Sequence, residues 1–154
     1  MKKVSPNARV LISDPSWENH RALFTQAGFT VGTYRYYDAA NRGINFAGFL
    51  ADLQAAPAET IVVLHACCHN PTGYDITPAQ WDEVVQVVKS RKLTAFLDMA
   101  YQGFGHGIAE DGAVVGKFVA AGVNFFVSTS FSKSFSLYGE RVGALSVVCQ
   151  SKEE

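Results

Sequence analysis

The sequence lacks the features that mark several specialised classes of protein. After the Lys2–Lys3 pair, the only apolar run near the N-terminus is Val10–Ile12, whereas a secretory signal needs about 7–15 apolar residues. No stretch approaches the ~20 apolar residues of a transmembrane helix. With only three cysteines, two of them adjacent, a disulfide scaffold is not expected. We therefore expect a soluble cytoplasmic protein in a reducing compartment, with no membrane partner.

An excess of one charge is also missing. Lys and Arg total 13 against 14 Asp and Glu, for a formal net charge of -1. No whole-chain basic field exists to attract a polyanion, so nucleic acid is not an expected partner. What the chain does have is apolar material, 48% of its 154 residues. That excludes a disordered tail and indicates one domain, or a piece of a larger one.

Short apolar runs alternate with amphipathic segments along the chain. Thr77 is a good helix N-cap and Pro78 suits the first helical position, whereas Tyr37–Asn45 is polar and is expected to be a loop. Apolar strands separated by helices predict an α/β fold, a mainly parallel sheet flanked by helices. The expected strands are Arg9–Ser13, Phe29–Tyr34, Thr60–His65, Leu93–Leu97, Val123–Ser128 and Val142–Cys149, and the expected helices are Glu18–Ala27, Phe46–Ala56, Pro78–Ser90 and Gly112–Ala121.

Ligands of open parallel sheets bind beyond the carboxyl ends of the strands. The polar segments that follow the expected strands are therefore the places to search for function. They are Asp14–Trp17, His65–Gly73, Asp98–Gly107 and Ser128–Arg141.

Two motifs in these segments admit other interpretations. His65–His69 reads His-Ala-Cys-Cys-His, but zinc ligands usually come as two separated pairs. No second pair exists, so we expect no metal here, and interpret these residues as buried thiols and locally bonded histidines. Ser130–Lys133 matches the Ser-x-x-Lys of penicillin-recognising hydrolases, yet the accompanying Ser-Asp-Asn and Lys-Thr-Gly motifs are absent.

A lysine at a strand end can instead form a Schiff base with an aldehyde cofactor such as pyridoxal 5'-phosphate (PLP). That cofactor needs a carboxylate at its pyridine nitrogen, donors at its phenolate oxygen, hydroxyls and an arginine at its phosphate, and a flat group at its ring face. The sequence offers each of these at a strand end: Asp98; Tyr101 and Asn70; Ser130, Ser132 and Arg141; and Trp17.

Four motifs carry a family resemblance. In order along the chain they read DPSWENH (14–20), HACCHNPTG (65–73), DMAYQGFGHG (98–107) and SFSKSFSLYGERVGAL (130–145). Together they resemble the class I (fold type I) PLP-dependent aminotransferases, in the aspartate and aromatic branch. The resemblance implies a transaminase that moves an amino group between an aromatic amino acid or aspartate and a 2-oxo acid such as 2-oxoglutarate.

The resemblance also implies a role for each site residue. Lys133 would bind PLP covalently and later shuttle a proton, Asp98 would pair with the pyridinium nitrogen, and Tyr101 and Asn70 would bond the phenolate oxygen. The remaining cofactor contacts would come from Ser130, Ser132 and Arg141 at the phosphate and from Trp17 near the ring, with His20 behind Asp98.

Each of these residues has a plainer alternative. Trp17 could be a surface aromatic, His20 a solvated helix residue, and Arg141 a partner of Glu140 alone. Asp98 and Lys133 could form a structural ion pair. For Tyr138, beside the lysine loop, core packing is the expected role, and His65 and His69 are left as structural or indirect.

The family is longer than this chain. The resemblance therefore implies that residues 1–154 are the central part of the PLP-binding large domain, with the N-terminal arm and the small C-terminal domain absent. It implies a homodimer for the intact protein. The alternative function is a truncated, catalytically inactive fragment of the PLP fold, and substrate preference is left open.

Overall fold

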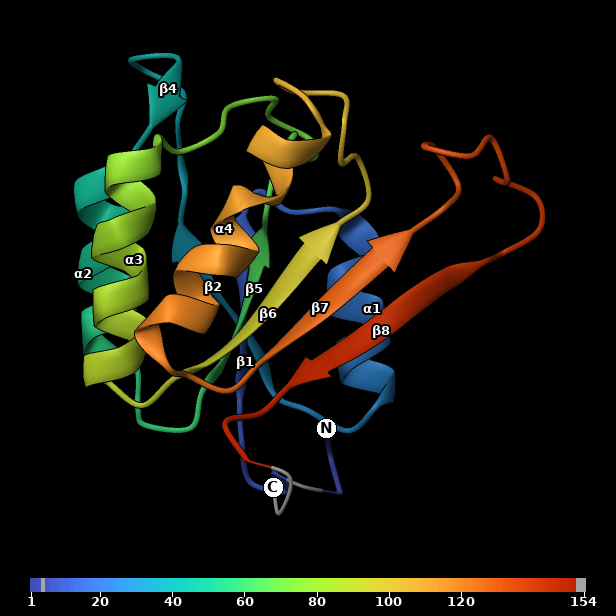
Figure 1. Ribbon diagram of the computed structural model, residues 1–154. Helices are drawn as coiled ribbons and strands as arrows, with labels where there is room; N and C mark the ends of the chain where they lie inside the picture. The colour runs from blue at the N-terminus through green and yellow to red at the C-terminus, as the bar shows by residue number, and fades with distance from the viewer. Residues whose placement is uncertain (4, 152–154) are drawn as a thin grey trace.

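The computed structural model describes residues 1–3 and 5–151 and has a six-stranded sheet at its centre (Figure 1). The strand order is β2-β1-β5-β6-β7-β8, and every neighbouring pair is parallel except β7 with β8. This confirms the predicted fold class. The strands are β1 (Val10–Asp14), β2 (Val31–Arg35), β5 (Ile61–His65), β6 (Thr94–Met99), β7 (Phe125–Ser130) and β8 (Gly143–Val148).

Helices cover both faces of this sheet. The helices α2 (Phe46–Ala55), α3 (Pro78–Ser90) and α4 (Ile108–Ala121) lie on one face, and α1 (Glu18–Gln26) lies on the other (Figure 1). Successive strand residues point to opposite faces, so Val62 and Leu64 of β5 join the larger core whereas Ile61 and Val63 join the smaller one. Both faces of β5 are therefore apolar, as the continuous run in the sequence predicts. None of the described helices has the length and apolar character needed to cross a bilayer.

Local sequence explains where the helices begin and end. The Thr77 hydroxyl accepts from the Gln80 amide, and the Gln80 side chain accepts from the Thr77 amide, which makes a reciprocal capping box. The α2 helix begins where the Asn45 side chain accepts from the Gly48 amide. The α4 helix ends at Gly122, whose φ of 63° is left-handed and suits glycine.

Several predicted boundaries were wrong. Residues 37–45 are not all loop, because β3 (Tyr37–Asp38) and β4 (Gly43–Ile44) form a small antiparallel hairpin. The α4 helix begins at Ile108 rather than Gly112. Strands β6 and β7 each run two residues further than predicted, so Asp98 and Ser130 lie within strands.

Candidate functional site

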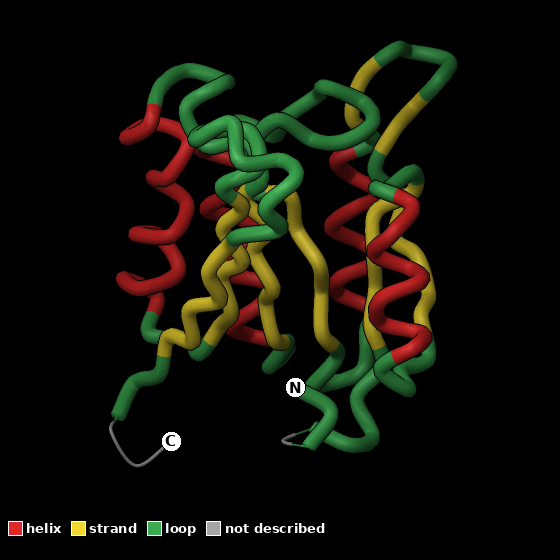
Figure 2. Tube along the Cα trace, turned by 90° about the vertical axis from the view of Figure 1, so that its right-hand side faces the viewer, coloured by secondary structure: helices red, strands yellow, loops and turns green. Residues whose placement is uncertain are grey.

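The carboxyl ends of β1, β5, β6 and β7 meet at one end of the sheet, where the connecting loops gather (Figure 2). A cavity of about 1040 Å³ opens there. It is lined by all nine residues that the sequence singled out: Trp17, His20, Asn70, Asp98, Tyr101, Ser130, Ser132, Lys133 and Arg141. Segments far apart in the chain thus converge as the strand-end rule predicts.

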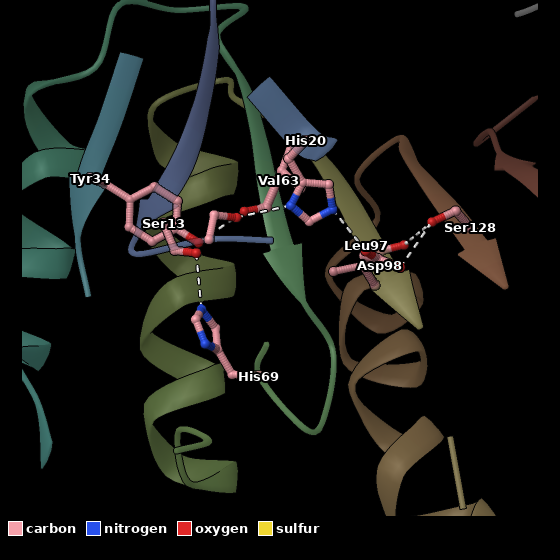
Figure 3. Close-up of polar contacts among 9 residues, drawn as sticks. Ser13, His20, Tyr34, Val63, His69, Leu97, Asp98 and Ser128 are labelled. Carbon is pink, nitrogen blue, oxygen red and sulfur yellow. Dashed lines mark hydrogen bonds and ion pairs between the residues drawn. The ribbon is translucent and has the colours of Figure 1, made fainter. Parts of the chain in front are cut away.

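Asp98 is the central carboxylate of the cavity. The sheet register places it between His65 of β5 and Ser128 of β7. Its Oδ2 atom lies 2.8 Å from His20 Nε2, and its Oδ1 atom accepts a long contact of 3.4 Å from the Ser128 hydroxyl (Figure 3). With a side chain only 14% exposed, Asp98 keeps acceptor capacity that faces the cavity.

His20 is buried and bonded on both ring nitrogens. Its Nδ1 lies 2.9 Å from the Ser16 hydroxyl and its Nε2 lies 2.8 Å from Asp98. A neutral ring with its proton on Nε2 satisfies both contacts, because it accepts from Ser16 and donates to Asp98. At 3% exposure His20 is not the solvated helix residue of the plainer interpretation. The Trp17 ring packs edge-on against it at 5.3 Å.

Lys133 has an amine without a carboxylate partner. Its Nζ lies 5.4 Å from the centre of the Tyr101 ring and 4.4 Å from that of Tyr138. Within the described chain no acidic group lies at ion-pair distance from it, so the structural pair with Asp98 is not formed. Tyr138 is 66% exposed and contacts this amine, so the expectation of core packing for Tyr138 was wrong.

Three candidate anion-binding groups lie at the end of β7 and on the connection from β7 to β8. The Ser130 hydroxyl accepts from the Ser132 amide at 3.2 Å, and Ser132 is buried. The Arg141 guanidinium donates to the Tyr138 carbonyl at 3.0 Å. Arg141 forms no ion pair with Glu140 in the described part of the chain. Its planar guanidinium therefore retains N–H donors for an anion.

A chain of buried polar contacts holds the loop that carries Asn70. His69 Nε2 lies 2.9 Å from the Ser13 hydroxyl (Figure 3). On the other side of the ring, His69 Nδ1 lies 2.8 Å from the Thr72 hydroxyl. The ring stacks on Tyr36 at 4.0 Å. Burial, with the nearby His65 and His20, lowers the pKa of His69 to about 3. His69 is therefore neutral at physiological pH.

His65 was not assigned to the site from the sequence, yet it lines the cavity. Its ring lies between those of His20 and His69, at 5.1 and 4.2 Å, and neither of its nitrogens has a partner among the described residues. Burial, followed by the proximity of His20, lowers the pKa of His65 to about 4. The available signal was its position at the end of a strand adjacent to that of Asp98.

Two further carboxylates were also missed, and both fix site loops. Asp75 accepts from the amides of Cys68 and His69, at 2.7 and 2.9 Å. Asp111, in the first turn of α4, accepts from the amides of residues 103, 105 and 106 just beyond Tyr101. No sequence motif marks either residue, because each acts on backbone groups brought to it by the fold.

The donor set fits PLP. The cavity is lined by a half-buried carboxylate, an amine without an acidic partner, phenol and amide groups, hydroxyls and a guanidinium with donors to spare. Two unpartnered nitrogens of His65 line it as well. Each chemical requirement of the cofactor thus has a group of the right type at the same end of the sheet.

Comparisons with known proteins agree with this arrangement. Residues 1–153 match the family model described as aminotransferase class I and II. The chain is 63% identical over its whole length to an aspartate aminotransferase of Pseudomonas aeruginosa, covering 39% of that protein. It is 54% identical over 99% of its length to the aromatic-amino-acid aminotransferase of Escherichia coli, covering 38% of that protein.

A solved structure shows the same fold. The aromatic-amino-acid aminotransferase of Burkholderia pseudomallei, covalently bound to pyridoxal phosphate, superposes with a TM-score of 0.97 at 63% identity. The match covers 99% of this chain and 38% of that one. The chain therefore spans about two fifths of the length of the relatives that it matches.

Proposed function

Because this chain belongs to the family of class I and II aminotransferases, we propose that it forms the PLP-binding core of a transaminase. The reaction moves an amino group from an aromatic amino acid or aspartate to a 2-oxo acid such as 2-oxoglutarate. Residues 1–154 would be the central part of the large domain of that enzyme. Substrates of both classes are proposed because the relatives carry both names.

The observation that carries the proposal is the pairing of two features in one cavity. Asp98 is held by the buried His20 at 2.8 Å, and Lys133 presents an amine with no described acidic partner. A structural lysine would be expected to pair or to extend into solvent. An unpaired amine facing a fixed carboxylate across a cavity suits covalent capture of a carbonyl compound.

When bound, PLP supplies an electron sink for the bonds of the substrate α-carbon. Lys133 would attach the cofactor through a Schiff base and, once released, its Nζ would move the proton at the substrate α-carbon. Asp98 would hold a proton on the pyridine nitrogen, and the His20 Nε2–H bond orients the carboxylate for that task.

The other residues bind and orient. Ser130, Ser132 and Arg141 would hold the phosphate, with the guanidinium making a planar fork. Asn70 and Tyr101 would donate to the phenolate oxygen, and Trp17 would close the ring face of the cavity. The intact protein would be a homodimer. A cytoplasmic location is in keeping with the unpaired state of Cys67, Cys68 and Cys149.

A second candidate function is that the 154-residue chain binds PLP but does not catalyse amino transfer. Apolar side chains on β8 favour it, since Leu145 is 61% and Val147 57% exposed. Such a face is normally covered in a working enzyme.

A titration tests Lys133. PLP is added to the chain and the absorbance of the protein-bound cofactor is recorded, with Lys133→Ala and Lys89→Ala measured in parallel. Lys89 lies exposed in the last turn of α3, away from the cavity. We expect a band in the wild type and in Lys89→Ala and none in Lys133→Ala. A band that survives in Lys133→Ala, or is absent from the wild type, overturns the covalent assignment.

Turnover separates the two candidates. Aspartate, tyrosine and phenylalanine are each supplied with 2-oxoglutarate, and the glutamate formed is measured. Transfer from any donor that depends on Lys133 supports the transaminase, whereas a Lys133-dependent band without transfer supports the binding-only candidate.

A further inference from the structure

We propose that Cys67, Cys68 and Asp111 form a binding site for a soft divalent cation such as Zn²⁺ or Cd²⁺, outside the cofactor cavity. Two thiol sulfurs and one carboxylate oxygen from these residues all lie within 4.8 Å of one another. Sulfur and carboxylate oxygen together are a common ligand set for such ions, with the fourth position left to water.

The backbone explains how adjacent cysteines meet. Neighbouring side chains of an extended strand point to opposite sides, which would separate the two sulfurs. Cys68 instead has a left-handed φ of 49°, and Asp75 holds this turn by accepting the Cys68 amide at 2.7 Å. The turn at the end of β5 therefore presents both thiols to one point.

The third ligand comes from a distant helix. Asp111 is 6% exposed and accepts three backbone hydrogen bonds of 2.8, 3.0 and 2.9 Å. A carboxylate has about four acceptor positions, so one remains for a cation. The sequence alone predicts no metal at His65–His69, because it shows no second group of ligands to complete a site. Asp111 of α4 comes close to the two cysteines only in the folded chain.

The local charge favours a cation. Two acidic side chains, Asp111 within the cluster and Asp75 at the Cys68 amide, lie beside the thiols, so the local field attracts a positive ion. Binding exchanges two thiol protons for one divalent ion and releases the protons to solvent, so no oxidant or reductant takes part. Affinity is therefore expected to rise with pH.

The site adjoins the residues proposed to bind the phenolate oxygen of PLP. The Cys68 thiol donates to the Tyr101 carbonyl at 3.7 Å, and Asp111 holds the loop that follows Tyr101. An ion that replaces the Cys68 proton removes that hydrogen bond. We therefore expect cation binding to weaken PLP binding, an expectation that rests on the proposed function.

The test is a Cd²⁺ titration of the full chain, followed through the ultraviolet absorbance of cadmium–thiolate bonds. All variants carry Cys149→Ser, because Cys149 is an exposed thiol elsewhere on the molecule. We expect saturation at one equivalent in this background, and displacement by Zn²⁺. Added Cys67→Ser or Cys68→Ser should abolish the stoichiometric band, and Asp111→Asn should weaken binding by at least about tenfold.

An unchanged titration in Cys67→Ser and Cys68→Ser overturns the site. If Asp111→Asn fails to fold by circular dichroism, Asp111→Ser takes its place, because it also lacks the carboxylate. Affinity equal to that of the Asp82→Asn control in a folded Asp111 variant removes Asp111 from the ligand set. PLP titrations with and without one equivalent of Cd²⁺ test the coupling, and equal affinities overturn it. Failure of PLP to bind at all would contradict the proposed function and leave the cadmium result standing.

Discussion

At the scale of single residues, the site is governed by what surrounds each charge. Asp98 is half-buried, is bonded to His20 and faces a cavity, whereas Lys133 faces two aromatic rings. Asp98 and Lys133 do not form an ion pair with each other. In the proposed function, the two side chains act at opposite ends of the same cofactor ring.

Asp98→Asn keeps the shape of the side chain and removes its charge. Hydrogen bonds to charged groups contribute about 1.5–3 kcal/mol, so we expect PLP affinity to fall by roughly tenfold or more. Equilibrium titration of PLP measures this loss. Asp38→Asn, on the exposed β3–β4 hairpin, is the matched control and should bind as the wild type does. Equal affinities for both variants would contradict the role of Asp98.

The buried histidines make stability depend on pH. The pKa of His65 is lowered from 6.5 to about 4 and that of His69 to about 3. Between about pH 6.5 and 4 the unfolded chain therefore binds more protons than the folded one, and the free energy of unfolding falls as pH falls. The stabilisation is fully present above pH 6.5.

Urea unfolding at several pH values checks this dependence. We expect the free energy of unfolding to lose on the order of 1 kcal/mol per pH unit for each histidine. His65→Leu should flatten the slope, while His106→Gln, in an exposed loop, should leave it unchanged. A slope that is the same in all three proteins would show that His65 does not carry it.

At the scale of elements, local chemistry decides where helices start. The capping box of Thr77 and Gln80 holds the first turn of α3, which carries the buried Trp81 and Val84. Strand ends depend on their neighbours instead. Pairing of β6 with β7 extends through Met99 and Thr129, beyond where either sequence run loses its apolar character.

Loss of the cap should be measurable. Thr77→Ala removes the acceptor for the Gln80 amide, and we expect the free energy of unfolding to fall by about 1 kcal/mol. Thr77→Ser keeps a hydroxyl in the same place and should lose only a small part of that amount. Chemical denaturation compares the two, and equal losses would mean that the methyl group rather than the hydrogen bond matters.

At the scale of the whole molecule, the two edges of the sheet differ. Strand β2 is packed by α2, whereas β8 leaves Leu145 and Val147 more than half exposed. Exposed apolar side chains along an edge strand promote association with another chain. Self-association through β8 is therefore expected at high concentration.

Val147→Lys places a charge on this face and should reduce self-association in sedimentation or light-scattering measurements across a concentration series. Val119→Lys is the matched control, since Val119 is 54% exposed but lies on α4. An equal reduction in both variants would point to net charge rather than to the face of β8.

Local patterns were enough to predict most of the fold, and the motifs with their family resemblance named nine residues that the structure places around one cavity. Apolar runs and caps are properties of neighbouring residues, and strand ends carry ligand groups whatever the order of the strands. Asp98, Lys133 and the seven other residues around the cavity could therefore be named before any coordinates, and their roles stay predictions. The hairpin in residues 37–45 could not, because its two-residue strands are too short to show a period.

What only the tertiary structure decided are the contacts between distant segments. His20 bonds Asp98, Ser13 bonds His69, and Asp111 joins the two cysteines. These pairs depend on strand order and register, which are set by the packing of the whole sheet and not by residues near each partner in the chain. The sequence by itself thus determined which chemical groups this protein brings to the carboxyl ends of its strands. The fold decided which of those groups contact one another.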